Sequence, residues 1–218
     1  MRNDFETVLF DFDGTLAKTM EDNFNAWRAV MADYRIELEP DDYYPLEGMP
    51  MLQLACRYLG TRGLTGVDPS EVARKKDEYY LAHHRFAFYP GVEELLDRLR
   101  AKSVRIGMVT VGRAERLTRS VPAGFLDRFN AVVTGDEIAE GKPSPAPYLT
   151  AAEKLQVNPA ACIVVENAPL GVASAKAAGA YCIGICSTVR GEMLGQADEV
   201  WPSFQDLRRS RAINSLLA

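Results

Sequence analysis

The chain has 218 residues, of which 47% are hydrophobic, and it carries 25 Lys and Arg against 30 Asp and Glu, a net charge of -5. Because the basic residues are spread along the chain, we expect no nucleic-acid partner. The strongly apolar runs are only as long as strands, so we expect no membrane span. The opening residues lack a signal-peptide pattern, which predicts a cytoplasmic protein. Monomer and homodimer both stay open.

The first predicted element is a short strand over Thr7–Phe10, rich in β-branched and aromatic side chains. Two carboxylates, Asp11 and Asp13, follow it directly, and Gly14 allows a sharp turn. Ligands of parallel α/β sheets bind at this end of the strands. One carboxylate can therefore attack as a nucleophile while the other transfers protons. The alternative is an ordinary turn, in which Asp and Gly are also common.

Residues 17–88 follow a helical pattern without a convincing strand. We expect helices over residues 19–34, 51–59 and 70–85. Such a segment, inserted directly after the first strand, predicts an all-helical cap domain over residues 17–88. The short connections at residues 17–19 and 86–90 are expected to act as hinges that let this domain close.

From residue 89 onward, strands alternate with helices. The expected strands cover residues 104–110, 131–134, 162–165 and 181–185, and the expected helices cover residues 92–102, 145–156 and 170–178. This alternation predicts an α/β fold, with a Rossmann-like parallel sheet core that carries helices on both faces. Residues 1–16 and 89–218 would form this catalytic core.

Polar residues follow several predicted strands. Thr110 ends the second strand, Lys142 lies in the loop after the third, and Glu166 and Asn167 follow the fourth. Taken singly, these residues are equally typical of a helix cap, a solvated loop and a turn. Considered together with Asp11, the set has two roles. The acids suit a divalent cation, and the Thr110 hydroxyl and Lys142 suit an anion. This set favours a phosphate ester bound with Mg²⁺.

These segments resemble the motifs of the haloacid dehalogenase superfamily, and they occur in the same order. The matching segments are Val8–Leu16, Met108–Thr110, Gly141–Pro145 and Val164–Val172, and Ala173–Gly179 is similar to the helix that follows the last motif in many members. The resemblance covers essentially the whole chain. The helical insertion after the first motif is similar to the cap of the phosphoglycolate phosphatase and beta-phosphoglucomutase branch.

The resemblance implies a role for each matching residue. Asp11 would be the nucleophile and a Mg²⁺ ligand, and Asp13 would be the general acid and base and would bind metal through its backbone carbonyl. Thr110 would hold the phosphoryl group, and Lys142 would balance the charge between Asp11 and the phosphate. An acid at position 13 implies phosphoryl transfer, because dehalogenases of this superfamily lack it.

Further residues are expected to contact the substrate or the metal. The backbone at Val111 and Gly112 could offer N–H groups to an anion. Glu47 and Gly48, in the loop of the cap, are the candidates for substrate selection.

The fourth motif departs from the family pattern. It reads Glu166-Asn167-Ala168, whereas relatives in this branch commonly have an acid at the position of Asn167. An amide oxygen can bind Mg²⁺ but is neutral, so we expect weaker metal binding unless Glu166 supplies the charge. The expected metal ligands are therefore Asp11, Asp13, Glu166 and Asn167. A second departure is Ala146, where many relatives carry Asp near the lysine loop.

The favoured function is a Mg²⁺-dependent phosphatase that hydrolyses a small phosphate monoester, such as a sugar phosphate or a phosphoglycolate-like compound, through an aspartyl-phosphate. The alternative is a beta-phosphoglucomutase-like phosphomutase, which needs a basic clamp for a second phosphate. The cap loop over residues 46–52 has no basic residue, although Arg57, Arg62 or Arg113 could substitute. A third hypothesis is a non-catalytic protein that binds a phosphorylated metabolite.

Overall fold

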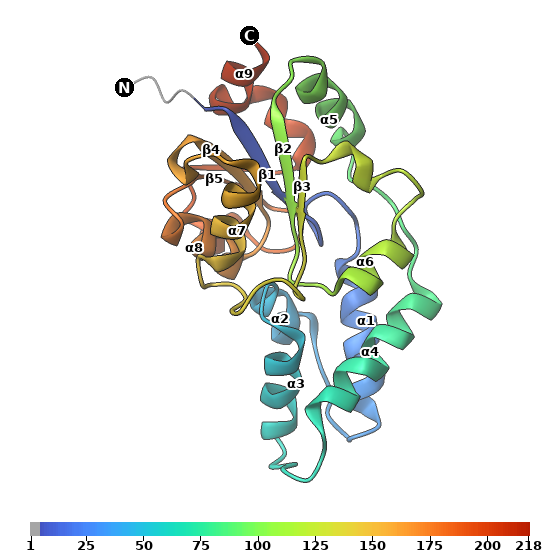
Figure 1. The fold of residues 1–218 in the computed structure, drawn as a ribbon. Helices are drawn as coiled ribbons and strands as arrows, with labels where there is room; N and C mark the ends of the chain where they lie inside the picture. Colours follow the sequence, from blue (N-terminus) through green and yellow to red (C-terminus); the bar gives the residue numbers. More distant parts are fainter. Residues whose placement is uncertain (1–4) are drawn as a thin grey trace.

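The computed structural model of the protein describes residues 5–218 and contains one parallel sheet with flanking helices (Figure 1). The strands are β1 (Thr7–Asp11), β2 (Arg105–Val109), β3 (Ala131–Val133), β4 (Cys162–Glu166), β5 (Tyr181–Ile185) and β6 (Glu199–Trp201). The helices around the sheet are α5 (Val92–Ala101), α6 (Ala114–Ser120), α7 (Ala146–Leu155), α8 (Pro169–Ala177) and α9 (Arg211–Leu217).

The strand order is β3-β2-β1-β4-β5-β6, and all neighbouring strands are parallel. The chain moves outward from β1 through β2 and β3, and then returns to the other side of β1 to form β4. The order therefore reverses between β1 and β4, which is where ligands of open α/β sheets bind. The carboxyl ends of both strands carry predicted site residues.

Both faces of the sheet are covered because successive side chains of a strand point to opposite faces. Val8 and Phe10 pack in one buried cluster with α5 and α9, whereas Leu9 packs in a second cluster with α7 and α8. The predicted α/β class with helices on both faces is confirmed. The β6 strand and helices α6 and α9 were not predicted. Each is only three to seven residues long and carries little periodic signal.

Residues 17–88 form a separate group of helices, here called the helical insert. Its helices are α1 (Met20–Ala32), α2 (Pro40–Tyr43), α3 (Met51–Gly60) and α4 (Pro69–His83). They enclose a hydrophobic cluster of their own, with Phe24, Trp27 and Met31 on the inner side of α1. Figure 1 shows the insert at the lower end of the molecule, beyond the carboxyl end of β1. It therefore faces the edge of the sheet that carries the predicted site.

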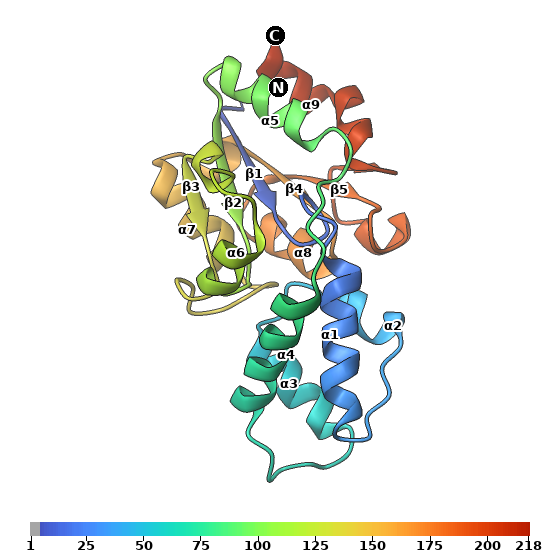
Figure 2. The same ribbon diagram turned by 90° about the vertical axis from the view of Figure 1, so that its right-hand side faces the viewer.

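Two chain segments connect the helical insert to the sheet, and they run side by side (Figure 2). The backbone N–H of Lys18 donates to the carbonyl of Ala87 over 2.8 Å, and the N–H of Tyr89 donates to the carbonyl of Leu16 over 3.1 Å. Lys18, Ala87 and Tyr89 lie within the predicted hinges, and Leu16 directly precedes the first of them. Across residues 5–218, no helix is both long and apolar enough to span a lipid bilayer.

Candidate active site

The structure brings four of the predicted site residues to one edge of the sheet. Asp11 ends β1, Thr110 follows β2, Lys142 lies in the loop before α7, and Glu166 ends β4. All four side chains are buried, and Glu166 is fully inaccessible to solvent. Because buried charges are costly unless they are paired, their close grouping requires specific partners.

Lys142 is held between two carboxylates. Its Nζ donates to Asp11 Oδ1 and to Glu166 Oε1, both over 2.6 Å. Burial lowers the pKa of Lys142, but the two carboxylates outweigh burial and raise the pKa above its ordinary range. The lysine therefore stays charged beside the proposed nucleophile.

The Glu166 carboxylate is fully occupied by protein donors. Its Oε1 also accepts from the Tyr148 hydroxyl over 2.7 Å, and its Oε2 accepts from the backbone N–H groups of Asn167 and Ala168, over 2.9 and 3.1 Å. With Lys142, four donors surround the carboxylate, which fills its usual acceptor capacity. This geometry favours a role in orienting Lys142, and the prediction that Glu166 binds metal stays a prediction.

Asn167 brings three oxygen atoms together. Its Oδ1 lies 3.2 Å from the Asp13 carbonyl oxygen and 3.3 Å from Asp11 Oδ2, and accepts from the Thr15 hydroxyl over 3.0 Å. Oxygen ligands around Mg²⁺ at about 2.1 Å lie about 3 Å from one another, so this spacing fits a bound cation. The reverse amide orientation would place Nδ2 among these oxygens as a donor instead. The reverse orientation makes more hydrogen bonds when no cation is bound, whereas a bound cation would favour the orientation with Oδ1 facing these oxygens.

The local charge also fits a cation. Asp11 and Glu166 share the single positive charge of Lys142. Burial raises the pKa of Asp11, and Lys142 offsets this only in part because Glu166 and Asp13 add negative charge. Within the described part of the chain, no three His, Cys, Asp or Glu side chains are grouped to hold a metal. A cation here would thus rely on carbonyl and amide oxygens in addition to Asp11.

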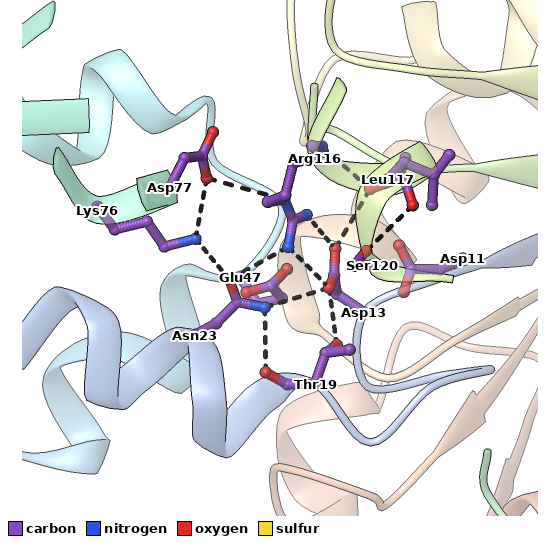
Figure 3. Close-up of polar contacts among 12 residues, drawn as sticks. Asp11, Asp13, Thr19, Asn23, Glu47, Lys76, Asp77, Arg116, Leu117 and Ser120 are labelled. Atoms are coloured by element: carbon purple, nitrogen blue, oxygen red, sulfur yellow. Dashed lines mark hydrogen bonds and ion pairs between the residues drawn. The ribbon is translucent and has the colours of Figure 1, made fainter. Parts of the chain in front are cut away.

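Asp13 lies in a network that joins the sheet to the helical insert (Figure 3). Its Oδ1 accepts from the Thr19 hydroxyl over 2.7 Å and from Asn23 Nδ2 over 3.2 Å. Its Oδ2 accepts from Arg116 Nη2 over 2.7 Å and from the Thr110 hydroxyl over 3.3 Å. Burial raises the pKa of Asp13, but the adjacent Arg116 outweighs burial and lowers the pKa to about 2.

Two buried cations in this network were missed by the sequence analysis. Arg116, on α6, is 6% exposed and Lys76, on α4, is 3% exposed. Lys76 Nζ donates to Asn23 Oδ1 over 2.5 Å, and burial lowers the pKa of Lys76 to about 8. The spacing of Lys76 from Val72 and Tyr80, four residues on either side, was a signal that it lies on the apolar face of α4. No comparable pattern marked Arg116.

Three of the predicted substrate-contacting residues, Glu47, Val111 and Gly112, line a small cavity of about 40 Å³ between the sheet and the helical insert. The other three, Thr110, Lys142 and Gly48, are not among its lining residues. Its walls include Asp13, Glu47, Lys76, Arg116 and the backbone around Val111 and Gly112. The N–H of Gly112 donates to the Thr110 hydroxyl over 3.0 Å. Tyr43 donates to Glu47 over 2.7 Å, and burial together with the charge of Asp13 raises the pKa of Glu47 to about 7.

The other arginines considered as substitutes for a basic clamp lie at the surface. Arg57, Arg62 and Arg113 are exposed, and Arg113 pairs with Asp136 at 3.5 Å. Among the described residues lining the small cavity, the positive charge therefore comes from Arg116 and Lys76.

Comparisons with known proteins agree with this geometry. The sequence profile of the haloacid dehalogenase-like hydrolases matches residues 8–185. Validoxylamine A 7'-phosphate phosphatase from Streptomyces hygroscopicus subsp. limoneus is 28% identical over 94% of this chain and 96% of its own length. Beta-phosphoglucomutase from Bacillus subtilis is 29% identical over 93% of this chain and 91% of its own length.

A solved structure gives the same result for the fold. The crystal structure of CbbY from Rhodobacter sphaeroides, in complex with xylulose-(1,5)bisphosphate, has a TM-score of 0.79 and 28% identity, and covers 93% of this chain and 96% of that chain. The chain belongs to the haloacid dehalogenase-like hydrolases and is an enzyme of that family. Its relatives include phosphatases and a phosphomutase that act on small phosphate esters.

Proposed function

We propose that the enzyme is a Mg²⁺-dependent phosphatase that hydrolyses a small phosphate monoester through an aspartyl-phosphate on Asp11. The observation that carries this proposal is the position of Lys142 Nζ, 2.6 Å from Asp11 Oδ1, with the second carboxylate, Asp13, bonded to Thr110. A nucleophile, a charge-balancing lysine and an acid thus meet around a hydroxyl suited to a phosphoryl oxygen.

The first half of the reaction transfers the phosphoryl group to Asp11. Asp11 Oδ1 attacks phosphorus, and the bond between phosphorus and the ester oxygen breaks. Asp13 must be in its protonated form for this step, although Arg116 favours the carboxylate in the structure. It then donates the proton to that oxygen, so the alcohol leaves in its neutral form. Lys142 and the Thr110 hydroxyl offset the negative charge of the phosphoryl oxygens during this step.

The second half releases inorganic phosphate. Asp13 accepts a proton from a water molecule as the water oxygen attacks phosphorus, and the bond between phosphorus and Asp11 breaks. The carboxylates of Asp11 and Asp13 then return to their starting states. Burial of the site between the sheet and the helical insert limits unwanted reactions with water.

Asp11 Oδ2, the Asp13 carbonyl and Asn167 Oδ1 would hold the Mg²⁺. When bound, this ion would supply positive charge that stabilises the negatively charged phosphoryl group.

We further propose that the helical insert acts as a cap that opens and closes about the paired connections at residues 16–18 and 87–89. The loop containing Glu47 and Gly48 would select the substrate.

The substrate proposed is a small phosphate ester such as a sugar phosphate or a phosphoglycolate-like acid. The phosphate ester for which the phosphatase relative is named supports this. A phosphomutase is the second candidate, favoured by the beta-phosphoglucomutase relative and by the buried cations Lys76 and Arg116, which could hold a second phosphate.

Release of inorganic phosphate from p-nitrophenyl phosphate and from a panel of sugar and small-acid phosphates tests the proposal. We expect phosphate release with Mg²⁺ and none after its removal by a chelator. Asp11→Asn should be inactive, whereas Asp97→Asn, at an exposed position on α5, should match the wild type. The proposal fails if the wild type is as inert as Asp11→Asn on the whole panel with Mg²⁺ present.

A second experiment separates the two candidates. Incubation with glucose 1-phosphate and a bisphosphate primer should give free phosphate if the enzyme is a phosphatase. Accumulation of glucose 6-phosphate instead would identify a phosphomutase.

A further inference from the structure

Arg116 is the only described side chain of α6 that reaches both Asp13 and the helical insert. Its Nη2 lies 2.7 Å from Asp13 Oδ2, and its Nη1 lies 3.3 Å from Asp13 Oδ1 and from Asn23 Oδ1 (Figure 3). The chain makes room for this guanidinium, because a Cβ on Gly112 would stand 2.1 Å from Nη2. A glycine at position 112 is therefore required for Arg116 to lie where it does.

The same guanidinium has one donor without a partner. Arg116 Nε is buried and makes no hydrogen bond to any described residue, and the facing Asp77 Oδ1 on α4 likewise accepts none. The two atoms are 3.9 Å apart, and Asp77 Oδ1 is also 3.6 Å from Lys76 Nζ. Buried polar atoms of opposite charge that stop short of hydrogen-bonding distance are costly. A closer approach of α4 to α6 would satisfy both atoms.

The present contacts also restrain Asp13. Each of its carboxylate oxygens accepts from at least two donors, and Arg116 contributes to both. Asp13 must direct one oxygen to the ester oxygen of a substrate in order to transfer a proton. A shift of the guanidinium toward Asp77 would loosen the contact with Asp13 while keeping the buried charge paired.

We propose that Arg116 is a positioning residue that couples the orientation of Asp13 to closure of the helical insert, through its ion pair with Asp77. This inference rests on the proposed function, since it assumes that Asp13 is the proton donor to the leaving oxygen. In the closed enzyme, Arg116 is shared between Asp77 and Asp13, and the Asp13 carboxyl is free to face the substrate.

The dependence of kcat/KM on the leaving group tests this role. An aryl phosphate such as p-nitrophenyl phosphate has a good leaving group and needs little proton donation, whereas phenyl and alkyl phosphates need more. In Arg116→Met and Asp77→Asn, kcat/KM should fall roughly tenfold or more for the poor leaving groups and by less than about threefold for p-nitrophenyl phosphate. Arg116→Lys should recover part of the loss, because it keeps the charge.

The control variant is Arg119→Met, on the same helix, where the arginine is exposed and pairs only with Glu115 among the described residues. It should match the wild type on every substrate. Urea unfolding of each variant checks that it is folded.

The double variant Arg116→Met/Asp77→Asn should lose no more kcat/KM than the worse single variant, since the two residues act through one pair.

An equal loss on all leaving groups, or no loss, would overturn the proposal, and additive losses in the double variant would overturn the link to Asp77. These outcomes differ from failure of the phosphatase function. In that case the wild type itself would release no phosphate from any ester.

Discussion

Gly48 of the helical insert lies directly against Lys142 of the catalytic core. A Cβ on Gly48 would stand 2.9 Å from Lys142 Cδ, closer than side chains tolerate, and Gly48 has a φ of +92°. The neighbouring loop is equally tight, because a Cβ on Gly141 would stand 2.5 Å from Pro50 Cγ. The insert therefore touches the proposed catalytic lysine itself, so its position and that of Lys142 depend on each other.

Gly48→Ala should lower kcat/KM by roughly tenfold or more, because the added methyl group displaces Lys142 or keeps the insert from closing. Gly63→Ala is the matched control. Gly63 also lies in the insert with a positive φ of +64°, but a methyl group added there would have no other atom within 4 Å, so it carries the backbone strain without the clash. Steady-state kinetics on one substrate and urea unfolding compare the two variants. Equal kinetic losses in both would attribute the effect to backbone strain alone.

Residues at strand ends were predictable from the sequence. A strand pattern fixes where its polar end lies, and parallel strands bring these ends to one edge. Asp11 and Thr110 were predicted in this way, and Lys142 was predicted in the loop that follows the third strand. By contrast, Arg116 and Tyr148 reach the site from helices, and which helix faces the site depends on packing that no local pattern specifies.

The alternation of side chains in β4 indicates which face of the sheet Glu166 lies on, and the sequence motif alone does not. Val164 packs in the cluster with α7 and α8, whereas Val165 packs on the opposite face. Glu166, two residues after Val164, therefore points toward α7, where Tyr148 and Lys142 bind it. The choice between Glu166 and Asn167 needed this assignment of faces, which requires knowledge of the surrounding helices.

Glu166→Gln tests whether this carboxylate orients Lys142. We expect kcat to fall about a hundredfold because Lys142 loses one of its two anionic partners, while the Mg²⁺ concentration for half-maximal activity changes by less than about threefold. Tyr148→Phe removes one hydrogen bond to Glu166 and keeps its charge, so it should have the same effect to a smaller degree. A tenfold or larger loss of Mg²⁺ affinity in Glu166→Gln, measured by calorimetry, would instead identify Glu166 as a metal ligand.

Asn167→Asp should tighten Mg²⁺ binding by roughly tenfold, because a second carboxylate replaces a neutral amide oxygen beside Asp11. Calorimetric titration with Mg²⁺ alone measures this without any substrate. Asn158→Asp adds the same charge at an exposed helix N-cap, where Asp is equally favourable, and should leave Mg²⁺ binding unchanged. If both variants bind Mg²⁺ like the wild type, Asn167 is not among the metal ligands.

The pH dependence of stability should reveal the environment of Glu47. Its pKa is raised from its ordinary value of 4.5 to about 7 by burial and by the nearby Asp13, despite the hydrogen bond from Tyr43. Between these two pH values the folded protein keeps a proton that the unfolded chain releases, so this group makes the free energy of unfolding fall as the pH rises from 4.5 to 7. Glu47→Gln removes that loss.

Relative to the wild type, Glu47→Gln should therefore gain on the order of 1 kcal/mol of stability between about pH 5 and about pH 8. The side chain keeps some contact with solvent, which reduces the effect of burial. Urea unfolding at the two pH values measures the difference. Glu153→Gln, at an exposed position of α7, should leave the pH dependence as in the wild type. A Glu47→Gln curve that stays parallel to the wild type across this range would mean that Glu47 is charged throughout. The carboxylate would then repel Asp13 at neutral pH, and closure of the helical insert would have to overcome that repulsion.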